Sequence, residues 1–545
     1  MFGTGRSVFW YGRPGDWVVL WLMLARVRSA AVLGIDAYLV DVEIDICSGM
    51  PTFNTVGLPQ GAVREGKERV AAALANAGYS LPLRRITVNL APADVPKQGS
   101  GFDLPIALGV LIASEQLPSV LQEGAGRRTV VAGELGLDGD LRPVRGALPI
   151  ALAARAAGAT TLILPSANVP EAAVVSDLTV LGAGSLAEVC RHLSGDVALE
   201  RAQVDPARYL AAAVRDEADF ADVRGQAGAK RALEVAAAGA HNILLIGPPG
   251  SGKTMLARRL PGILPAMSLD EALETTKVHS VAGLLGAGRA LCTTRPFRAP
   301  HHTISDAGLV GGGTPPRPGE VSLAHGGVLF LDELPEFRSS VLEVLRQPLE
   351  DGTVTLSRAA MSLTYPARIM LAAAMNPCPC GYSGDPAHAC LCAPHAVQRY
   401  RARVSGPLLD RIDIHLEVPA IPYRDLTGAQ PAEPSKAIAE RVERARAAQR
   451  ARFTGIAGMH ANAHMTAREV RRYCALGAES EGILRSAITR LGLSARAYHR
   501  VLKIARTIAD LAGADSLHVA HVAEAIQYRS LDRGHPAPFP SVSPS

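Results

Sequence analysis

A glycine-rich octapeptide has the residue types that bind the phosphates of a nucleoside triphosphate. It follows an apolar run, 242–246, and precedes a helix-like stretch, 255–260. Its glycines let successive backbone N–H groups surround a β-phosphate, while its lysine supplies positive charge and its threonine hydroxyl can ligate Mg²⁺. A chance glycine-rich turn would not need this full pattern between a strand and a helix. We therefore predict a P-loop that binds ATP and Mg²⁺, formed by Gly247, Pro248, Pro249, Gly250, Ser251, Gly252, Lys253 and Thr254.

Two carboxylates follow a second apolar run, Val328 to Leu331. Asp332 and Glu333 would then lie at the edge of an α/β sheet where catalytic groups gather. We predict that Asp332 holds Mg²⁺ through water and that Glu333 orients and polarises the attacking water. An acidic turn after a core strand would be the better interpretation only if no P-loop preceded it. The pair therefore indicates ATP hydrolysis.

Two further polar residues have positions that an oligomeric ATPase would use. Asn376 ends a third apolar strand candidate, 369–375, and suits a sensor that lies between the two strands above and helps to orient the water. Arg411 could reach the γ-phosphate of a neighbouring subunit as an arginine finger, which implies a ring. The alternative for Arg411 is a surface salt bridge with Asp410 or Asp413, and the spacing alone favours neither interpretation.

Four of the eight cysteines lie close together, as the pairs Cys378/Cys380 and Cys390/Cys392. In a reducing cytosol, paired thiols are more often metal ligands than disulfides, and four thiolates could hold a tetrahedral structural Zn²⁺. The C-x-C spacing is tighter than the common C-x₂-C spacing, so reduced loop cysteines are an equal alternative. The cluster is therefore a candidate zinc site.

Two segments rich in turn residues interrupt the region of these motifs. The first, 297–320, contains His301 and His302, which lack a partner at a metal spacing and so favour hydrogen-bonding or interface roles. It is predicted to form an extended loop or hairpin. The second, 351–363, is predicted to form a hairpin with Arg358 near its tip. In a ring both segments could face the pore, where Arg358 would contact DNA phosphates.

The composition is that of a globular protein, because 48% of the 545 residues are hydrophobic and 20% are charged. The formal net charge is +5, but Pro431 to Ser545 carries 17 Lys and Arg against 10 Asp and Glu, a balance of +7 that leaves −2 for the rest. A contact with a polyanion is therefore expected in the C-terminal part or in a loop. The apolar stretch 17–24 is far shorter than the roughly 20 residues that span a membrane, so we expect a cytoplasmic protein.

Composition also divides the chain into parts. Strand-like runs alternate with alanine-rich helical stretches before the P-loop, and helix-like stretches follow a proline-containing linker after the core. Five helices are predicted there, at 435–452, 466–474, 479–491, 495–512 and 516–529. The expected parts are a disordered or mis-called N-terminal extension (1–22), an α/β domain (23–195), a linker (196–219), an ATPase core (220–418), a second linker (419–434), a helical lid domain (435–530) and a disordered tail (531–545).

Six stretches carry a family resemblance that begins at Met23 and covers nearly the whole chain: 23–27, 53–59, 225–232, 299–305, 326–337 and 376–381. The chain resembles the YifB/ComM family of magnesium-chelatase-like AAA+ ATPases, in the clade with helix-2 and pre-sensor-1 insertions. The resemblance implies a nucleotide-dependent homohexamer, with Arg411 as the trans arginine finger and Arg496 as the sensor 2 of the helical lid. For ComM-like members it also implies translocation on single-stranded or branched DNA, with branch migration during recombination of transforming DNA.

The N-terminal domain is similar to the Lon-protease-type α/β fold, which is also called ribosomal S5 domain 2-like. In active Lon-like proteases a serine follows a Pro-Lys-Asp-Gly-Pro stretch and a lysine follows a Gly-Gly pair. Here Gly101, next to Ser100, has the place of the serine, and Leu148 has the place of the lysine. Without that amine nothing deprotonates a serine. We therefore interpret this domain as a binding or assembly module.

Three classes of function remain. A DNA-stimulated ATPase motor is preferred, because the chain joins a complete ATPase site to pore-type insertions and a basic C-terminal part. A metal-insertase chaperone, like the ATPase subunit of magnesium chelatase, is the alternative, and it would need partner subunits. A Lon-like protease is the least favoured class. The response of the ATPase activity to single-stranded DNA separates the first two.

Overall fold

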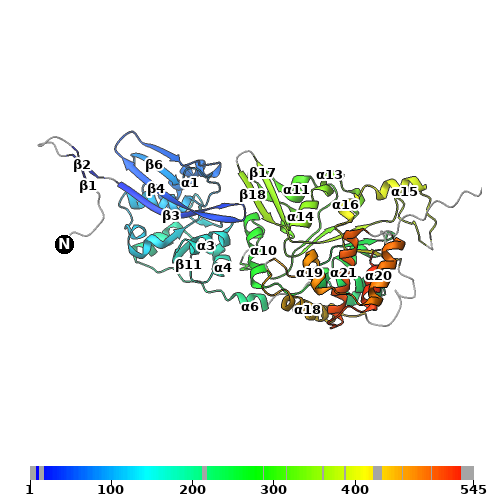
Figure 1. Cartoon of the computed structure of the whole chain (residues 1–545). Coiled ribbons are helices and arrows are strands. Elements are labelled where there is room, and N and C mark those ends of the chain that lie inside the picture. Colours follow the sequence, from blue (N-terminus) through cyan, green and yellow to red (C-terminus); the bar gives the residue numbers. More distant parts are fainter. Residues whose placement is uncertain are drawn as a thin grey trace, which may run out of the picture. The chain divides into compact units, whose positions relative to one another are not determined.

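The computed structural model describes residues 8–11, 18–21, 23–211, 218–286, 288–314, 316–358, 361–385, 388–420, 432–456, 458–491 and 494–529. These residues form two compact units, whose elements are labelled in Figure 1. The N-terminal unit joins the chain up to Ala212 with Ala272–Cys292, and the P-loop unit joins Ala213–Glu271 with the chain from Thr293. Each unit combines strands with helices, so the predicted α/β fold class is confirmed.

A seven-stranded mixed sheet forms the N-terminal unit, in the order β11-β10-β7-β3-β4-β6-β5. Along β4 every second side chain, from Val40 to Ile46, is buried, which is the pattern of a strand with one face against the core. Helix α2, by contrast, is buried along its whole length, because nearly all of its residues are apolar. The strands are β3 (Met23–Leu33), β4 (Asp36–Cys47), β5 (Thr52–Val56), β6 (Arg85–Ala91), β7 (Thr129–Val131), β10 (Thr161–Pro165) and β11 (Thr179–Ala183). A smaller pair is β8 (Glu134–Leu135) and β9 (Leu141–Arg142), and the helices are α1 (Ala62–Asn76), α2 (Asp103–Ala113), α3 (Ala147–Ala156), α4 (Val169–Ala172), α5 (Leu186–Ser194) and α6 (Pro206–Ala211).

One helix from the region after the P-loop contributes most of its length to the N-terminal unit. This helix is α10 (Leu269–Ala282), and residues from Ala272 onward belong to that unit. The Ser280 hydroxyl donates a hydrogen bond to Glu171, and Lys277 forms an ion pair with Asp36 at 2.5 Å. The predicted ATPase core, 220–418, includes 272–292, whereas in the structure Ala272–Cys292 belongs to the N-terminal unit.

A five-stranded parallel sheet forms the centre of the P-loop unit, in the order β13-β16-β19-β12-β20. All four neighbouring pairs are parallel. The predicted sensor strand, β19, lies between the strands that end in the P-loop and in the two carboxylates, as the sequence suggests. Strands β12, β16 and β19 are buried at every residue, which explains their continuous apolar runs. The strands are β12 (Ile243–Ile246), β13 (Phe297–Arg298), β16 (Val328–Leu331), β19 (Met370–Met375) and β20 (Ile414–Glu417).

The two turn-rich segments have different structures. The first contains β13, a helix, a two-residue strand pair and a second helix, so it is only partly the predicted hairpin. The second is a regular antiparallel hairpin, in which Arg358 ends β17 and pairs with Met361 at the start of β18. The elements of the segments and around them are α7 (Ala227–Gly239), α8 (Lys253–Ala257), α9 (Leu260–Ile263), α11 (Asp306–Val310), β14 (Gly311–Gly312), β15 (Arg317–Pro318), α12 (Glu320–Leu323), α13 (Ser339–Glu343), α14 (Arg346–Asp351), β17 (Thr353–Arg358), β18 (Met361–Pro366), α15 (Pro394–Arg401) and α16 (Gly406–Leu409).

A bundle of helices follows the sheet, and Figure 1 shows α18, α19, α20 and α21 gathered together. The five predicted helices are all present, with ends that differ by no more than a few residues. Apolar side chains from this bundle share one core cluster with the sheet, including Val442, Val501 and Val522. The helices are α18 (Ser435–Arg452), α19 (Ala467–Tyr473), α20 (Ala478–Leu491), α21 (Ala495–Leu511) and α22 (Val519–Gln527).

Parts of the predicted extension, linkers and tail fall outside the described residues. In the extension, β1 (Val8–Tyr11) pairs with β2 (Val18–Trp21) as an antiparallel ribbon, while 1–7, 12–17 and 22 are outside. Of the linkers, 212–217 and 421–431 are outside, as are 530–545 at the end of the chain. Among the described residues, no helix has both the length and the apolar character to cross a membrane.

Candidate nucleotide site

The P-loop connects β12 to α8, and its backbone explains its glycines. Gly250 and Gly252 have φ values of 76° and 82°, which a residue with a side chain adopts only with strain. A Cβ on Gly247 would lie 2.1 Å from the carbonyl oxygen of Val418. The Gly247 N–H donates to the Met375 carbonyl at 3.2 Å, which ties the start of the loop to β19. The loop therefore presents its backbone at the amino end of a helix, where anions bind.

Lys253 joins the P-loop to the neighbouring strand. Its ammonium group donates to the carbonyl oxygens of Gly247 at 2.8 Å and Pro248 at 2.9 Å, and to Asn376 Oδ1 at 3.3 Å. Burial lowers the pKa of Lys253, while the negative charges of the two carboxylates after β16 oppose that change. The structure thus brings the predicted phosphate-binding lysine and the predicted sensor asparagine into direct contact.

The two carboxylates lie beside the end of the P-loop. The Thr254 hydroxyl donates to Asp332 Oδ2 at 2.6 Å, so a hydroxyl and a carboxylate oxygen meet where the resemblance implies Mg²⁺. Both are ligand types that Mg²⁺ prefers, so these residues fit the ion. Glu333 adopts the left-handed region at φ 53°, and its N–H donates to Asp332 Oδ1 at 3.0 Å. Its side chain is 57% exposed and so is accessible to a water molecule.

His302 lies next to Glu333, a contact that sequence analysis does not anticipate. His302 Nδ1 is 3.5 Å from Glu333 Oε2. The ring of His302 also lies 4.1 Å from the ring of His301 and packs edge-on against Phe337. The contact arises because β13, which leads to the two histidines, pairs with β16, which leads to the carboxylate. Only knowledge of the strand order could have revealed it from the sequence.

Arg411 lies at the other end of the sheet from the P-loop. The Asn242 side chain, just before β12, donates to the Arg411 carbonyl at 2.9 Å, whereas the P-loop follows β12. A strand of four residues spans about 13 Å. The guanidinium donates to the Pro407 carbonyl at 2.6 Å and forms an ion pair with Glu350. The alternative interpretation predicted a salt bridge with Asp410 or Asp413, but the carboxylate that pairs with Arg411 is Glu350 of α14.

Arg496 lies near the same end of the sheet. It is the second residue of α21, is 65% exposed, and places a guanidinium nitrogen 3.9 Å from Asp410 Oδ2. One turn later, Arg500 Nε is 3.2 Å from Asp413 Oδ1. The predicted sensor 2 and the predicted finger are therefore neighbours, and both are separated from the P-loop of their own chain by the length of the strands.

A pocket of about 440 Å³ opens at this end of the sheet. Its lining includes Arg411, Arg500 and Lys503 together with Asp413 and Glu350. Burial lowers the pKa values of Arg500 and Lys503. Burial also opposes ionisation of Asp413, but the hydrogen bond from His241 and the nearby positive charges outweigh it and lower the pKa of Asp413. The pocket therefore combines several cations with carboxylates from the same chain.

The four clustered cysteines meet in space. The Sγ atom of Cys378 lies 3.3 Å from that of Cys380 and 3.7 Å from that of Cys390, and all four sulfur atoms lie within 4.8 Å of one another. Zn–S bonds of about 2.3 Å in a tetrahedron require sulfur atoms about 3.8 Å apart. No disulfide joins any of the cysteines, and backbone hydrogen bonding together with the Cys378 thiol lowers the pKa of Cys380 to about 6. The thiols therefore fit Zn²⁺.

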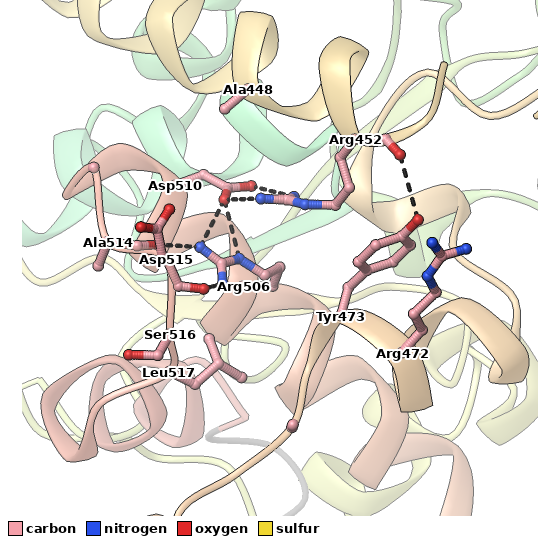
Figure 2. A pocket seen from close by; sticks show the side chains of 12 residues that line it. Ala448, Arg452, Arg472, Tyr473, Arg506, Asp510, Ala514, Asp515, Ser516 and Leu517 are labelled. Atoms are coloured by element: carbon pink, nitrogen blue, oxygen red, sulfur yellow. Dashed lines mark hydrogen bonds and ion pairs between the residues drawn. The ribbon is translucent and has the colours of Figure 1, made fainter. Parts of the chain in front are cut away.

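A second pocket, of about 420 Å³, lies within the helical bundle. Figure 2 shows Asp510 between two guanidinium groups. Arg452 donates to Asp510 at 2.5 and 2.8 Å, and Arg506 donates to it at 3.0 Å. The Tyr473 hydroxyl donates to the Arg452 carbonyl at 3.4 Å. Since Asp510 pairs with both guanidinium groups, we interpret this pocket as part of the architecture of the bundle.

The N-terminal unit lacks the lysine of an active Lon-like protease. Leu148 is fully buried in α3, and its N–H donates to Glu171 at 2.8 Å. Ser100, beside Gly101, donates a hydrogen bond to Glu134, and a carboxylate does not have the basicity of a neutral amine. The structure therefore offers no support for proteolysis at these positions.

A P-loop and two carboxylates on a parallel sheet, followed by a helical bundle, define an AAA+ ATPase. Three family models match the chain: magnesium chelatase subunit ChlI over 219–426, subunit ChlI of Mg-chelatase over 42–168, and the C-terminal part of that subunit over 432–529. The chain is 46% identical over 517 residues to the competence protein ComM of Haemophilus influenzae, covering 94% of this chain and 98% of the relative. It is 44% identical over 514 residues to the uncharacterized protein YifB of Escherichia coli, covering 94% and 98%.

The chain therefore belongs to the magnesium-chelatase-like AAA+ ATPase family that includes the ComM and YifB proteins, as sequence analysis predicts. A shorter similarity, 34% identity over 157 residues, relates it to Lon protease 2 of Bacillus subtilis. That match covers 26% of this chain and 27% of the protease. The similarity is confined to the N-terminal part, in agreement with the predicted Lon-like fold.

Proposed function

We propose that this ATPase is a cytoplasmic ring motor that acts on DNA. The proposal of a ring is supported by the separation of the P-loop from Arg411 by the length of the sheet. An arginine at that distance cannot stabilise the γ-phosphate bound by its own chain, but it can serve a neighbour that stacks its P-loop against this edge. Each complete site then needs two chains, and a closed ring, such as a homohexamer, satisfies every chain.

The roles of the site residues follow from their contacts. The P-loop backbone and Lys253 bind the phosphates of ATP, and Thr254 and Asp332 hold Mg²⁺, which neutralises the charge that develops on the phosphates. Glu333 accepts a hydrogen bond from the attacking water and orients it. Asn376 helps to orient the same water. Arg411 and Arg496 act on the neighbour's nucleotide. Cys378, Cys380, Cys390 and Cys392 hold a structural Zn²⁺.

Three features support DNA as the substrate. A relative that matches over most of its length is named a competence protein, and the resemblance to ComM-like members implies action on transforming DNA. The β17–β18 hairpin, in which Arg358 ends β17, directly precedes β19 along the chain, the strand that leads to the sensor Asn376. The C-terminal part of the sequence is basic. These features favour contacts with phosphates of single-stranded or branched DNA, which bind positive groups without regard to sequence.

The deciding experiment measures ATPase activity of the purified protein at low salt with single-stranded, duplex and branched DNA. We expect stimulation by single-stranded or branched DNA, and native mass measurement with ATP and Mg²⁺ should show a ring. The variant Lys253→Ala is the control for contaminating ATPases. If none of the DNAs changes the rate, the motor proposal is wrong.

A second candidate is an ATPase that drives metal insertion with partner subunits. All three matching family models describe a magnesium chelatase subunit, which favours this class. The additional similarity to a Lon protease, over 157 residues, does not itself point to metal insertion. An ATPase that ignores DNA but responds to a partner protein would establish the second candidate.

A further inference from the structure

The cysteine cluster lies directly beside the nucleotide loop. The chain leaves β19 at Met375, whose carbonyl accepts the Gly247 N–H at 3.2 Å. The next residue, Asn376, accepts from Lys253 at 3.3 Å. Cys378 follows two residues later. The segment that carries the first two thiols therefore begins with two hydrogen bonds to the P-loop.

A third contact joins the far end of this segment to the P-loop. Gly381 follows Cys380 and adopts φ 88°. A Cβ at Gly381 would lie 2.5 Å from Cδ and 2.7 Å from Cγ of Pro249, which is too close for a side chain. The backbone of the cysteine turn, 376–381, therefore packs against the proline ring of the P-loop.

Isolated hydrogen bonds hold the rest of the cysteine turn, including one from the Arg401 guanidinium to the Pro377 carbonyl at 3.1 Å. Residues 376–385 and 388–393 form no helix or strand. The turn has a hydrogen bond from the Gly381 N–H to the Cys378 carbonyl at 3.0 Å, and Ser383 N donates to Cys378 Sγ at 3.3 Å. The second pair of thiols arrives from 390–392 and places Cys390 Sγ 3.6 Å from Cys380 Sγ. A metal ion at the four sulfur atoms would cross-link the two ends of this irregular loop.

We propose that the metal bound by the four cysteines holds the 376–381 turn against Pro249, so that metal occupancy sets the affinity of the P-loop for nucleotide. The proposal rests on the zinc site of the proposed function. The metal would then support the phosphate-binding loop, rather than stabilise only a segment far from the nucleotide. Zn²⁺ is the expected ion, because it is a borderline-soft divalent ion that favours four thiolates in a tetrahedron. Since the metal stands outside the site of hydrolysis, its loss should weaken binding of nucleotide more than it slows the chemical step.

A matched pair of glycine variants tests the contact. Gly381→Ala places a methyl group against Pro249 and leaves all four thiols in place. Gly384→Ala is the control, because Gly384 has a similar φ of 83° but nothing lies within 4 Å of its Cβ. Zinc per chain is measured by elemental analysis of the full-length protein, and the Kd of a fluorescent ATP analogue with Mg²⁺ is measured in parallel. We expect Gly381→Ala to keep its zinc and to raise Kd about tenfold, as overpacking of this size does, and Gly384→Ala to change neither.

A second pair tests the metal itself. Cys390→Ser should lose zinc and, because the turn then loses its cross-link, raise the same Kd about tenfold, whereas Cys47→Ser, which changes an exposed thiol outside the cluster, should change neither. Thermal melting checks that each variant is folded. Wild-type nucleotide affinity in folded Gly381→Ala, or in folded zinc-free Cys390→Ser, would overturn the coupling. Absence of zinc from the wild-type protein would overturn the metal site instead.

Discussion

The two ends of the parallel sheet in the P-loop unit differ in what their charges are paired with. At the carboxyl end, Lys253 donates to backbone carbonyls and an asparagine, and the Glu333 side chain is 57% exposed. At the amino end, Arg411 is almost buried and is paired with Glu350, while Arg500 is paired with Asp413. The carboxyl end thus leaves charged groups available to ATP and water, whereas the amino end pairs its guanidinium groups with carboxylates of the same chain.

The difference suggests how a ring would control hydrolysis. A guanidinium held by a carboxylate of its own chain must exchange that partner for a phosphate before it can stabilise a transition state. Glu350 is half exposed, so the exchange does not require unfolding of the core. The carboxyl end would bind ATP in any single chain, but hydrolysis would wait for the amino end of a neighbour.

The largest effect is expected from the lysine of the carboxyl end. Lys253→Ala removes the positive charge that faces the phosphates, so nucleotide binding and ATP hydrolysis should both be lost. Binding of a fluorescent ATP analogue and release of phosphate measure the two losses. Lys277→Ala is the control, because that lysine lies in the N-terminal unit and pairs with Asp36. If Lys253→Ala binds nucleotide with normal affinity, the P-loop is not the phosphate-binding site.

The arginine of the amino end should act on another chain. Arg411→Ala alone should lower kcat about 1,000-fold or more, as loss of an arginine finger does, with nucleotide binding retained. Mixing it with Lys253→Ala should restore part of the ATPase rate, because mixed rings contain sites with an intact P-loop and an intact finger. Arg485→Ala, at an exposed position of α20, is the control. No recovery in rings shown by mass to be mixed would make the trans assignment wrong.

Glu333 should separate binding from chemistry at the carboxyl end. Glu333→Gln keeps the size of the side chain but removes the charge that polarises water, so kcat should fall about 100- to 1,000-fold while the Kd for ATP stays near its wild-type value. Rapid-quench measurement of one turnover distinguishes slow chemistry from slow product release. Near-normal hydrolysis by this variant would assign the base to another residue.

His302 should modulate the same carboxylate. Because His302 Nδ1 lies 3.5 Å from Glu333 Oε2, His302→Ala frees the glutamate to leave its position, and kcat should fall about tenfold. His301→Ala is a matched control, since His301 contacts Thr303 rather than the carboxylate. The affinity for ATP should not change in either variant. Equal effects of the two substitutions would indicate a packing role for the histidine pair.

The smallest effect is expected outside both ends, at the β17–β18 hairpin. Arg358→Ala should lower DNA stimulation of the ATPase a few-fold, to a similar degree for different DNA sequences, and should reduce its dependence on salt. The rate without DNA should remain. Salt titrations of the DNA-stimulated rate, compared with those of Arg485→Ala, measure the difference. An unchanged salt dependence would exclude Arg358 from the DNA contacts.

The helices after the core could be predicted from the sequence nearly to the residue, whereas one core helix could not be assigned to its unit. Helix α18 has the predicted ends, Ser435 and Arg452, because a proline precedes it and apolar residues repeat at helical spacing. Helix α10 also has helical periodicity, but periodicity does not say which neighbour buries its apolar face. Its contacts with Glu171 and Asp36 depend on the fold of a distant part of the chain.

Local sequence patterns are enough to predict the chemistry of the carboxyl end. A P-loop and an acidic pair after a buried strand are local patterns, and parallel strands bring their carboxyl ends to one edge, so Lys253, Asp332 and Asn376 had to meet. Four other contacts become visible only in the folded chain: Glu350 pairs with Arg411, Arg496 lies beside Asp410, His302 lies beside Glu333, and Gly381 packs on Pro249. Those contacts join residues far apart in the chain, and their partners follow from strand order and loop path, which no local pattern encodes.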